Sequence, residues 1–160
     1  MNDYRTGDRL LVAAPTVGSK ALRWWLNSRY SHVVPIIDVS GKTLEVRYPQ
    51  PYFSTVNDYL DGKHRILHLR PVQELSDLQI NNYLTVVDHV QFRDYDILSF
   101  AGFLSNREYI ENKSKLNCSE AMLTLDHAMG LLLGRSMALV SPQSYVEFEA
   151  AGIFKIVDLK

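Results

Sequence analysis

The order in which short strands and helices follow one another constrains the fold of this 160-residue chain more than any other feature. Apolar and β-branched runs bounded by turn residues fill the early part of the chain, and apolar residues at helical spacing fill the later part. Strands are predicted over 10–14, 32–39, 43–47, 65–69 and 153–159, and helices over 19–27, 55–60, 75–91, 95–104, 118–133 and 142–150. Strands that cluster early and helices that cluster late favour an α+β fold with an antiparallel sheet.

The turn at Ser40-Gly41 is expected to join two antiparallel strands, packed on the helix that begins near the chain's cysteine. A simple hairpin turning there pairs Glu45 with Ile36. That pairing leaves Glu45 four residues of strand, about 13 Å, away from the position opposite His32. Pro35 removes a ladder donor from the first strand, so this strand is expected to lie at a sheet edge or to carry a bulge.

Composition narrows the class of protein. A hydrophobic content of 46% and a charged content of 22% describe an ordinary globular protein, and the length predicts a single domain over 1–160. The net charge of -1, with no long run of one sign, lacks the electrostatic footprint of a nucleic-acid binder. A single cysteine excludes an intrachain disulfide and a cysteine-rich zinc site. Histidines at HExxH spacing, an EF-hand pattern and a P-loop are all missing from the sequence, so no metal and no cofactor is expected.

The sequence also bears on location. Its first eight residues contain no apolar core of a signal peptide. The longest apolar runs, such as 97–104, are too short to span a bilayer. We therefore expect a soluble, cytoplasmic protein with no transmembrane segment.

The lone cysteine lies in the segment 115–122, which leads into the most strongly helical part of the chain. Asn117 is a favourable N-cap residue, and Glu120 occupies the position of the acid in a capping box. Cys118 is then the first helical residue, where free backbone amides and the helix dipole favour a thiolate, the nucleophilic form of the side chain. The alternative is a small buried hydrophobic residue without chemistry.

A nucleophilic thiol needs a base, and the five histidines differ in their suitability. His64 and His68 flank a basic strand and are interpreted as surface residues. His127 lies nine residues beyond Cys118 on the same predicted helix, about 13.5 Å away along its axis. His32 opens an apolar strand, where an imidazole is costly unless it is hydrogen-bonded or functional. Its alternative role is a strand-edge histidine bonded to a backbone carbonyl.

Two further features bear on a site. Trp24 and Trp25 are candidates for lining a substrate groove, although one core tryptophan and one half-exposed tryptophan is the simpler expectation. The backbone amide of Cys118 is a candidate donor to an oxyanion.

An ordered set of short motifs carries a resemblance to a known family. The motifs are Gly7-Asp8-Arg9-Leu10-Leu11, Tyr30-Ser31-His32-Val33, Tyr95-Asp96 with Gly102, Asn117-Cys118-Ser119-Glu120 and Ser141-Pro142. Together they resemble the circularly permuted papain-like cysteine hydrolases of the YiiX/YaeF group, which are related to NlpC-type peptidases and to lecithin:retinol acyltransferase. One departure is Val34-Pro35, at a place where many members have glycine.

This resemblance implies a permuted papain-like (NlpC-type) fold, in which an antiparallel sheet packs on a central helix carrying the nucleophile. By position, Cys118 is similar to the family's nucleophile, His32 to its base and Glu45 to its third polar residue. The implied activity is a thiol hydrolase (amidase or peptidase) or acyltransferase, acting on small-molecule, peptide or lipid-derived amides or esters. Peptidoglycan peptides, other isopeptide-like amides and lipid acyl groups remain open as substrates. The alternatives are a catalytically silent binding module and a structural protein. For Glu45, an outward-facing strand carboxylate is the competing interpretation.

Overall fold

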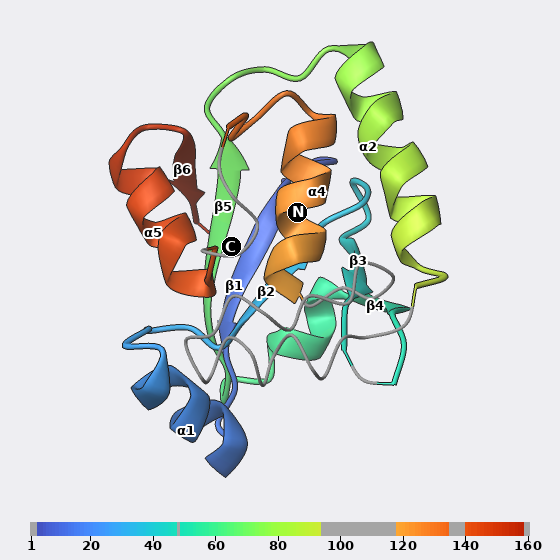
Figure 1. Ribbon diagram of the computed structural model, residues 1–160. Coiled ribbons are helices and arrows are strands. Elements are labelled where there is room, and N and C mark those ends of the chain that lie inside the picture. Colours follow the sequence, from blue (N-terminus) through green and yellow to red (C-terminus); the bar gives the residue numbers. More distant parts are fainter. Residues whose placement is uncertain (1–2, 48, 94–117, 135–139, 159–160) are drawn as a thin grey trace.

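The computed structural model describes residues 3–47, 49–93, 118–134 and 140–158 and shows a mixed α+β fold (Figure 1). A four-stranded sheet has the order β2-β1-β5-β6, and every neighbouring pair in it is antiparallel. A separate antiparallel pair is formed by β3 and β4. The strands are β1 (Arg9–Ala13), β2 (His32–Pro35), β3 (Lys42–Glu45), β4 (Tyr52–Thr55), β5 (Arg65–Pro71) and β6 (Phe154–Val157). The helices are α1 (Val17–Trp25), the 3-10 helix η1 (Val56–Tyr59), α2 (Asp77–Val90), α4 (Cys118–Ala128) and α5 (Pro142–Ala150).

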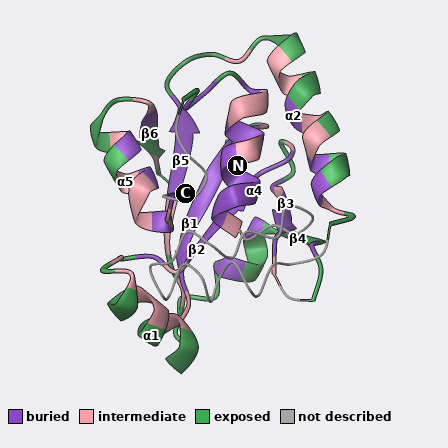
Figure 2. Ribbon diagram, viewed as in Figure 1, coloured by how far each residue is buried: buried purple, intermediate pink, exposed green. Residues whose placement is uncertain are grey.

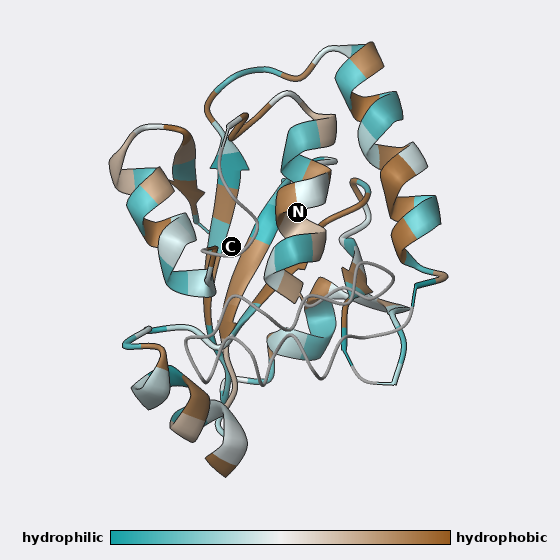
Figure 3. Cartoon of the chain, in the orientation of Figure 1, coloured by the Kyte–Doolittle hydropathy of each residue, from teal (hydrophilic) through white to brown (hydrophobic). Residues whose placement is uncertain are grey.

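Strand β1 is buried along its whole length because both faces of the sheet are covered. Side chains of a strand alternate between faces. Leu11 and Ala13 accordingly join the larger core with α2, α4 and α5, whereas Leu10 and Val12 join a smaller core with η1. The strong hydrophobic colour of β1 in Figure 3 and its burial in Figure 2 reflect this position.

Helix α4 is the central helix of the larger core. It packs against both β2 and α2, and most of its residues are buried, including polar ones such as Glu120 and Asp126 (Figure 2). The predicted extension of this helix to residue 133 is wrong, because α4 ends at Ala128. Gly130 and Leu132 have φ angles of 73° and 53°, and the left-handed backbone at these two residues cannot continue a right-handed helix.

The predicted antiparallel arrangement of the strands is confirmed, but the prediction that 32–39 and 43–47 lie in one sheet is wrong. Strands β2 and β3 belong to different sheets, and the chain segments that follow β2 and begin β3 are joined by an antiparallel bridge between Ile36 and Thr43. The turn between them spans Asp38 to Gly41, where the Gly41 amide donates to the Asp38 carbonyl at 3.1 Å. It lies one residue earlier in the chain than predicted. The edge position expected from Pro35 is confirmed, because β2 is the outermost strand of its sheet.

The remaining predictions agree to within a few residues. The helix over 142–150 has the predicted bounds, and the short helix near 55–60 is the 3-10 helix η1. Strand β4 is not among the predicted strands, and it begins directly after Pro51. The helix predicted over 95–104 lies outside the described residues. Within the described part of the chain, no helix is long and apolar enough to span a bilayer.

Candidate active site

The packing of α4 on β2 brings the cysteine and the histidine singled out by the sequence to the same place. Cys118 is the first residue of α4, and His32 is the first residue of β2. A hydrogen bond between the two side chains contributes to the pKa of each. The imidazole is largely buried, and the thiol is partly exposed. Cys118 is therefore the more exposed member of the pair, and the base is shielded from water.

Glu45 is the buried acid beside His32. Its Oε2 lies 3.0 Å from Nε2 of His32, and it is only 1% exposed. The same oxygen forms an ion pair with Nε of Arg47 at 2.9 Å. The other oxygen, Oε1, accepts a hydrogen bond from the hydroxyl of Tyr59. Burial alone raises the pKa of this carboxyl. The hydrogen bond and charge of His32, with the charge of Arg47, outweigh burial and hold the pKa of Glu45 below its usual value.

The position of the turn explains how Glu45 reaches His32. Continuing the Ile36–Thr43 pairing by two residues on each strand places Glu45 opposite Val34, and so diagonal to His32. Residues that are diagonal to each other on two paired strands have backbones about 7–8 Å apart in space, a distance that a long side chain can bridge. The expected pairing of Glu45 with Ile36, and the larger gap that followed from it, are therefore wrong.

The contacts of His32 give its two ring nitrogens different partners. Because Nε2 donates its proton to Glu45, Nδ1 is the ring nitrogen left for the sulfur of Cys118. Nε of Arg47 also lies 3.3 Å from Nε2 of His32. It cannot donate to a nitrogen that already carries a proton, so the effect of Arg47 on the ring passes through Glu45.

The electrostatics of the pair favour its ionised form. Burial raises the pKa of the Cys118 thiol, but the charge and hydrogen bond of His32 and the backbone amide of Val33 outweigh it and lower the pKa below its ordinary value. Burial lowers the pKa of His32. The negative charge of Cys118 and the hydrogen bond to Glu45 override that effect and raise the pKa of His32 to about 9. Both shifts favour the form of the pair in which a thiolate lies beside an imidazolium.

The other predicted candidates lie elsewhere. The ring of His127 is 3.1 Å from the carbonyl of Leu132, at the opposite end of α4 from Cys118. His64 pairs with Asp61 at 2.9 Å. His68 was interpreted as a surface residue, and this is wrong: it is 2% exposed and lies on the central strand β5.

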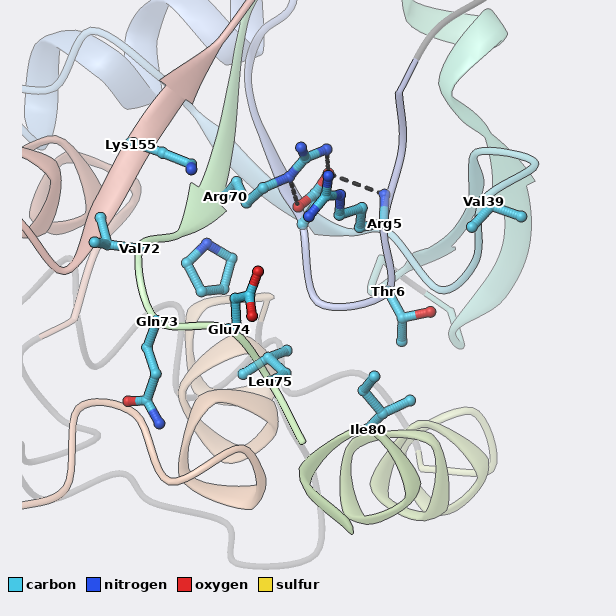
Figure 4. A pocket seen from close by; sticks show the side chains of 12 residues that line it. Arg5, Thr6, Val39, Arg70, Val72, Gln73, Glu74, Leu75, Ile80 and Lys155 are labelled. Atoms are coloured by element: carbon cyan, nitrogen blue, oxygen red, sulfur yellow. Dashed lines mark hydrogen bonds and ion pairs between the residues drawn. The ribbon is translucent and has the colours of Figure 1, made fainter. Parts of the chain in front are cut away.

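His68 belongs to a buried charge cluster at the start of β1, the end of the strand opposite the His32 site. Its Nε2 lies 2.8 Å from Asp8, which also accepts two hydrogen bonds from Arg70, at 2.9 and 2.8 Å. Asp8 and Arg70 border a cavity of about 410 Å³, drawn in Figure 4. The Gly7-Asp8 motif therefore anchors β5 to the start of β1, and the structure places it away from Cys118.

Arg47 and Tyr59 also belong to the candidate site, and neither is among the residues predicted from the sequence. A signal for Arg47 exists, because it lies two residues after Glu45 and so shares its side of an extended chain. No comparable pattern marks Tyr59, which belongs to η1 and reaches Glu45 only through the packing of that helix.

The described fold is thus of an α+β class in which an antiparallel sheet packs on a helix that begins with a cysteine. No protein-family model matches the sequence, and no curated protein matches it. Among solved structures, the chain is similar to YiiX of Escherichia coli O157:H7, described as a metalloprotein of DUF1105. The TM-score is 0.54 at 17% identity, over 96% of this chain and 87% of that protein. The likeness shows that the two proteins share a fold.

The description of YiiX as a metalloprotein raises the question of whether this site fits a metal. Cys118, His32 and Glu45 are all potential ligands by type. In the parts of the chain that the structure describes, however, no group of three or more such side chains is arranged to hold an ion. His32 and Glu45 are hydrogen-bonded directly to each other, and Arg47 already pairs with the carboxylate. The residues do not fit a metal, and no step is assigned to one.

Proposed function

We propose that this protein is a YiiX-like thiol hydrolase or acyltransferase with a permuted papain-like fold, which cleaves an amide or ester through a Cys118 acyl-enzyme. The observation that carries the proposal is the position of His32 between the thiol of Cys118 and a buried carboxylate. A nucleophile, a base and a group that orients the base are the three parts of covalent acyl-transfer chemistry. The histidine strand precedes the cysteine helix in the chain, which is the permuted order.

The proposed reaction begins with the thiolate. Its sulfur attacks the carbonyl carbon of the substrate, and the carbonyl π-electrons move to oxygen to give a tetrahedral oxyanion. The oxyanion collapses, the bond to the leaving amine or alcohol breaks, and Nδ1–H of His32 supplies the proton that this group needs. The product of this half-reaction is a thioester on Cys118 and a neutral imidazole.

The second half-reaction reverses the role of the imidazole. Neutral His32 accepts a proton from water, or from an amine or alcohol acceptor, as that nucleophile attacks the thioester. Collapse of the second tetrahedral intermediate breaks the carbon–sulfur bond and restores the thiolate beside an imidazolium. Glu45 stays ionised throughout, because its depressed pKa keeps it a carboxylate. Its part is to hold the ring and stabilise the positive charge.

The oxyanion needs donors. Cys118 is the first residue of α4, and the first amides of a helix lack partners within the helix and point toward its N-terminal end. We assign the backbone amide of Cys118 as one such donor. The arrangement suits acyl transfer without distinguishing one acyl substrate from another. Peptidoglycan peptides, other isopeptide-like amides and lipid acyl groups are the substrate classes to test.

Alkylation of the protein by iodoacetamide at neutral pH tests the proposed nucleophile. Cys118 should react faster than a free thiol with its usual pKa, because its lowered pKa increases the thiolate fraction at neutral pH. The matched comparison is the same protein in denaturant, where the pKa returns to its ordinary value. A native thiol that reacts more slowly than the unfolded one would overturn the proposal.

Turnover is tested separately, with a panel of peptide amides, lipid amides and esters carrying reporter leaving groups. The proposal requires an acyl-enzyme whose mass increase on Cys118 equals that of the acyl group, with release of one leaving group per acylated protein. A reactive thiol that forms no such adduct with any member of the panel would favour a binding module that keeps the fold.

A further inference from the structure

Helix α1 exposes an apolar face. None of its residues is buried, and Val17, Trp24 and Trp25 are 83%, 81% and 55% exposed. The spacing 17, 21, 24 and 25 places these residues and the exposed Ala21 on one side of the helix. Figure 2 shows α1 largely green and pink, in contrast to the buried α4. The expectation of one core tryptophan is wrong, and two large aromatic side chains face solvent together.

Positive charge surrounds this face. Lys20, Arg23 and Arg29 lie on α1 or just after it, and the sequence contains neither aspartate nor glutamate from residue 9 to residue 37. Within the described part of the chain, none of these three cations takes part in a side-chain ion pair. The whole chain carries a net charge of -1, whereas the stretch from residue 9 to residue 37, which contains α1 and both tryptophans, has basic residues and no acidic ones.

The position of α1 links this surface to the candidate active site. The helix connects the end of β1 to His32, the first residue of β2, and lies at that end of the sheet (Figure 1). A hydrogen bond of 2.6 Å joins the hydroxyls of Ser19 and Ser31, and Ser31 immediately precedes His32. A surface that receives α1 therefore lies at the same end of the molecule as the histidine.

We propose that α1 docks on the surface of an anionic lipid bilayer, with Trp24 and Trp25 in the interfacial region and the cations next to lipid phosphates. An apolar helix face with tryptophan, bordered by lysine and arginine, has the chemistry of an interfacial helix. Tryptophan favours the boundary between headgroups and acyl chains, and each nearby cation gains from the negative surface potential. The docking itself does not depend on the chemistry proposed for Cys118.

Charge argues against a second copy of this chain as the occupant. A symmetric dimer through α1 would bring Lys20, Arg23 and Arg29 of one copy against the same residues of the other. Like charges brought together at an interface oppose association. A bilayer rich in anionic lipid offers the opposite charge over an extended plane, which suits the three cations and the two tryptophans at once.

The two tryptophans make the test direct, because they are the only tryptophans in the chain and both lie on α1. Purified protein is titrated with vesicles of phosphatidylcholine alone and of phosphatidylcholine with phosphatidylglycerol. With the anionic vesicles we expect a blue shift of tryptophan emission and co-sedimentation, both weakened by salt. Replacing Lys20 and Arg23 by Gln should lower partitioning roughly fivefold for each cation removed.

Matched variants distinguish docking through α1 from nonspecific hydrophobic binding to vesicles. Trp24→Ser with Trp25→Ser should abolish co-sedimentation. Leu78→Ser removes an exposed apolar side chain, 69% exposed, near the start of α2 at the far end of the molecule (Figure 1), and should leave co-sedimentation unchanged. Circular dichroism and Cys118 alkylation should be unaltered in every variant, so loss of docking is distinguishable from loss of the proposed chemistry. The proposal is overturned if anionic vesicles produce no shift, if Leu78→Ser weakens binding as much as the tryptophan changes do, or if the emission shifts without lipid as the protein dimerises.

Discussion

Oε2 of Glu45 lies 3.0 Å from Nε2 of His32, although the two residues belong to strands of different sheets. The contact depends on the bridge between Ile36 and Thr43, which fixes how β3 lies against β2. Glu45 is held from its other side by Tyr59 of η1. The candidate site therefore forms only when the small two-stranded sheet and the 3-10 helix are docked against the edge of the larger sheet.

Replacing Cys118 by Ser should remove all covalent labelling by an electrophile and all turnover through an acyl-enzyme. The chain has no other thiol, and a hydroxyl at this position stays protonated beside an imidazole. The change is nearly isosteric, so the free energy of unfolding should move by no more than about 1 kcal/mol. Mass spectrometry after incubation with iodoacetamide, together with a urea melt, checks both statements. Labelling that persists in the variant would place the nucleophile elsewhere.

Replacing His32 by Ala should raise the pKa of the Cys118 thiol. The positive imidazolium stabilises the thiolate, and its removal leaves burial, which raises the pKa, opposed only by neighbouring amides and hydroxyls. The acid limb of the alkylation rate should therefore move to higher pH. His127→Ala is the matched control, because its ring contacts the Leu132 carbonyl at the other end of α4. Overlapping profiles for wild type and His32→Ala would show that the pair is wrongly assigned.

Replacing Asp8 by Asn should destabilise the fold by up to about 3 kcal/mol, because it removes the buried carboxylate that pairs with His68 and Arg70 and leaves Arg70 only the exposed Asp3 as an acidic partner. Burial raises the pKa of Asp8, but hydrogen bonds from His68 and Arg70 outweigh it and hold the pKa below its usual value. A carboxyl with a depressed pKa stabilises the fold above its unfolded pKa, and this stability is lost as the pH falls through the folded value.

Urea melts of the Asp8→Asn variant from pH 6 down to pH 2 provide the measurement. The wild type should lose stability more steeply than the variant over the acid end of this range. Asp61→Asn is the control, since Asp61 bonds the His64 ring and neighbouring amides at an exposed turn, and its removal should have little effect. Parallel pH dependence in wild type and Asp8→Asn would contradict the assigned role of Asp8.

Local patterns in the sequence predicted the elements well, and pairings between distant elements poorly. The apolar runs of β1 and β5 and the helical spacing of α2 and α5 gave these elements within a few residues. The turn before β3 lies one residue earlier than predicted because the side chain of Asp38 stabilises it. Its Oδ1 accepts hydrogen bonds from the amides of Ser40 and Lys42, at 2.8 and 3.2 Å, and so fixes where the chain reverses.

The one-residue difference in the position of this turn determines the distance between Glu45 and His32. A turn one residue earlier shifts the pairing by two residues and converts a distant carboxylate into a diagonal neighbour. Residues such as Tyr59 and His68 could not be placed in the same way. Their surroundings depend on which elements pack together, and this information is not carried by the periodicity of their own segments.

Replacing Glu45 by Gln should lower the pKa of His32 below its value of about 9. Glutamine keeps an oxygen that accepts the Nε2 proton, so the ring should stay in place, but it removes the negative charge that favours the imidazolium. A base whose charged form loses a stabilising partner has a lower pKa, so the imidazolium should lose its proton at a lower pH in the variant than in the wild type. The nitrogen NMR shifts of the His32 ring, followed from pH 6 to pH 11, measure this directly.

Tyr59→Phe provides the graded comparison for Glu45→Gln. It removes the hydroxyl that donates to Oε1 of Glu45 but leaves the carboxylate charge beside His32. Its effect on the pKa of His32 should therefore be smaller than that of Glu45→Gln. If the two changes shift the His32 titration equally, the role of Glu45 is one of position rather than charge. If neither shifts it, the ring is not coupled to this carboxylate, and Glu45 is not the third member of the site.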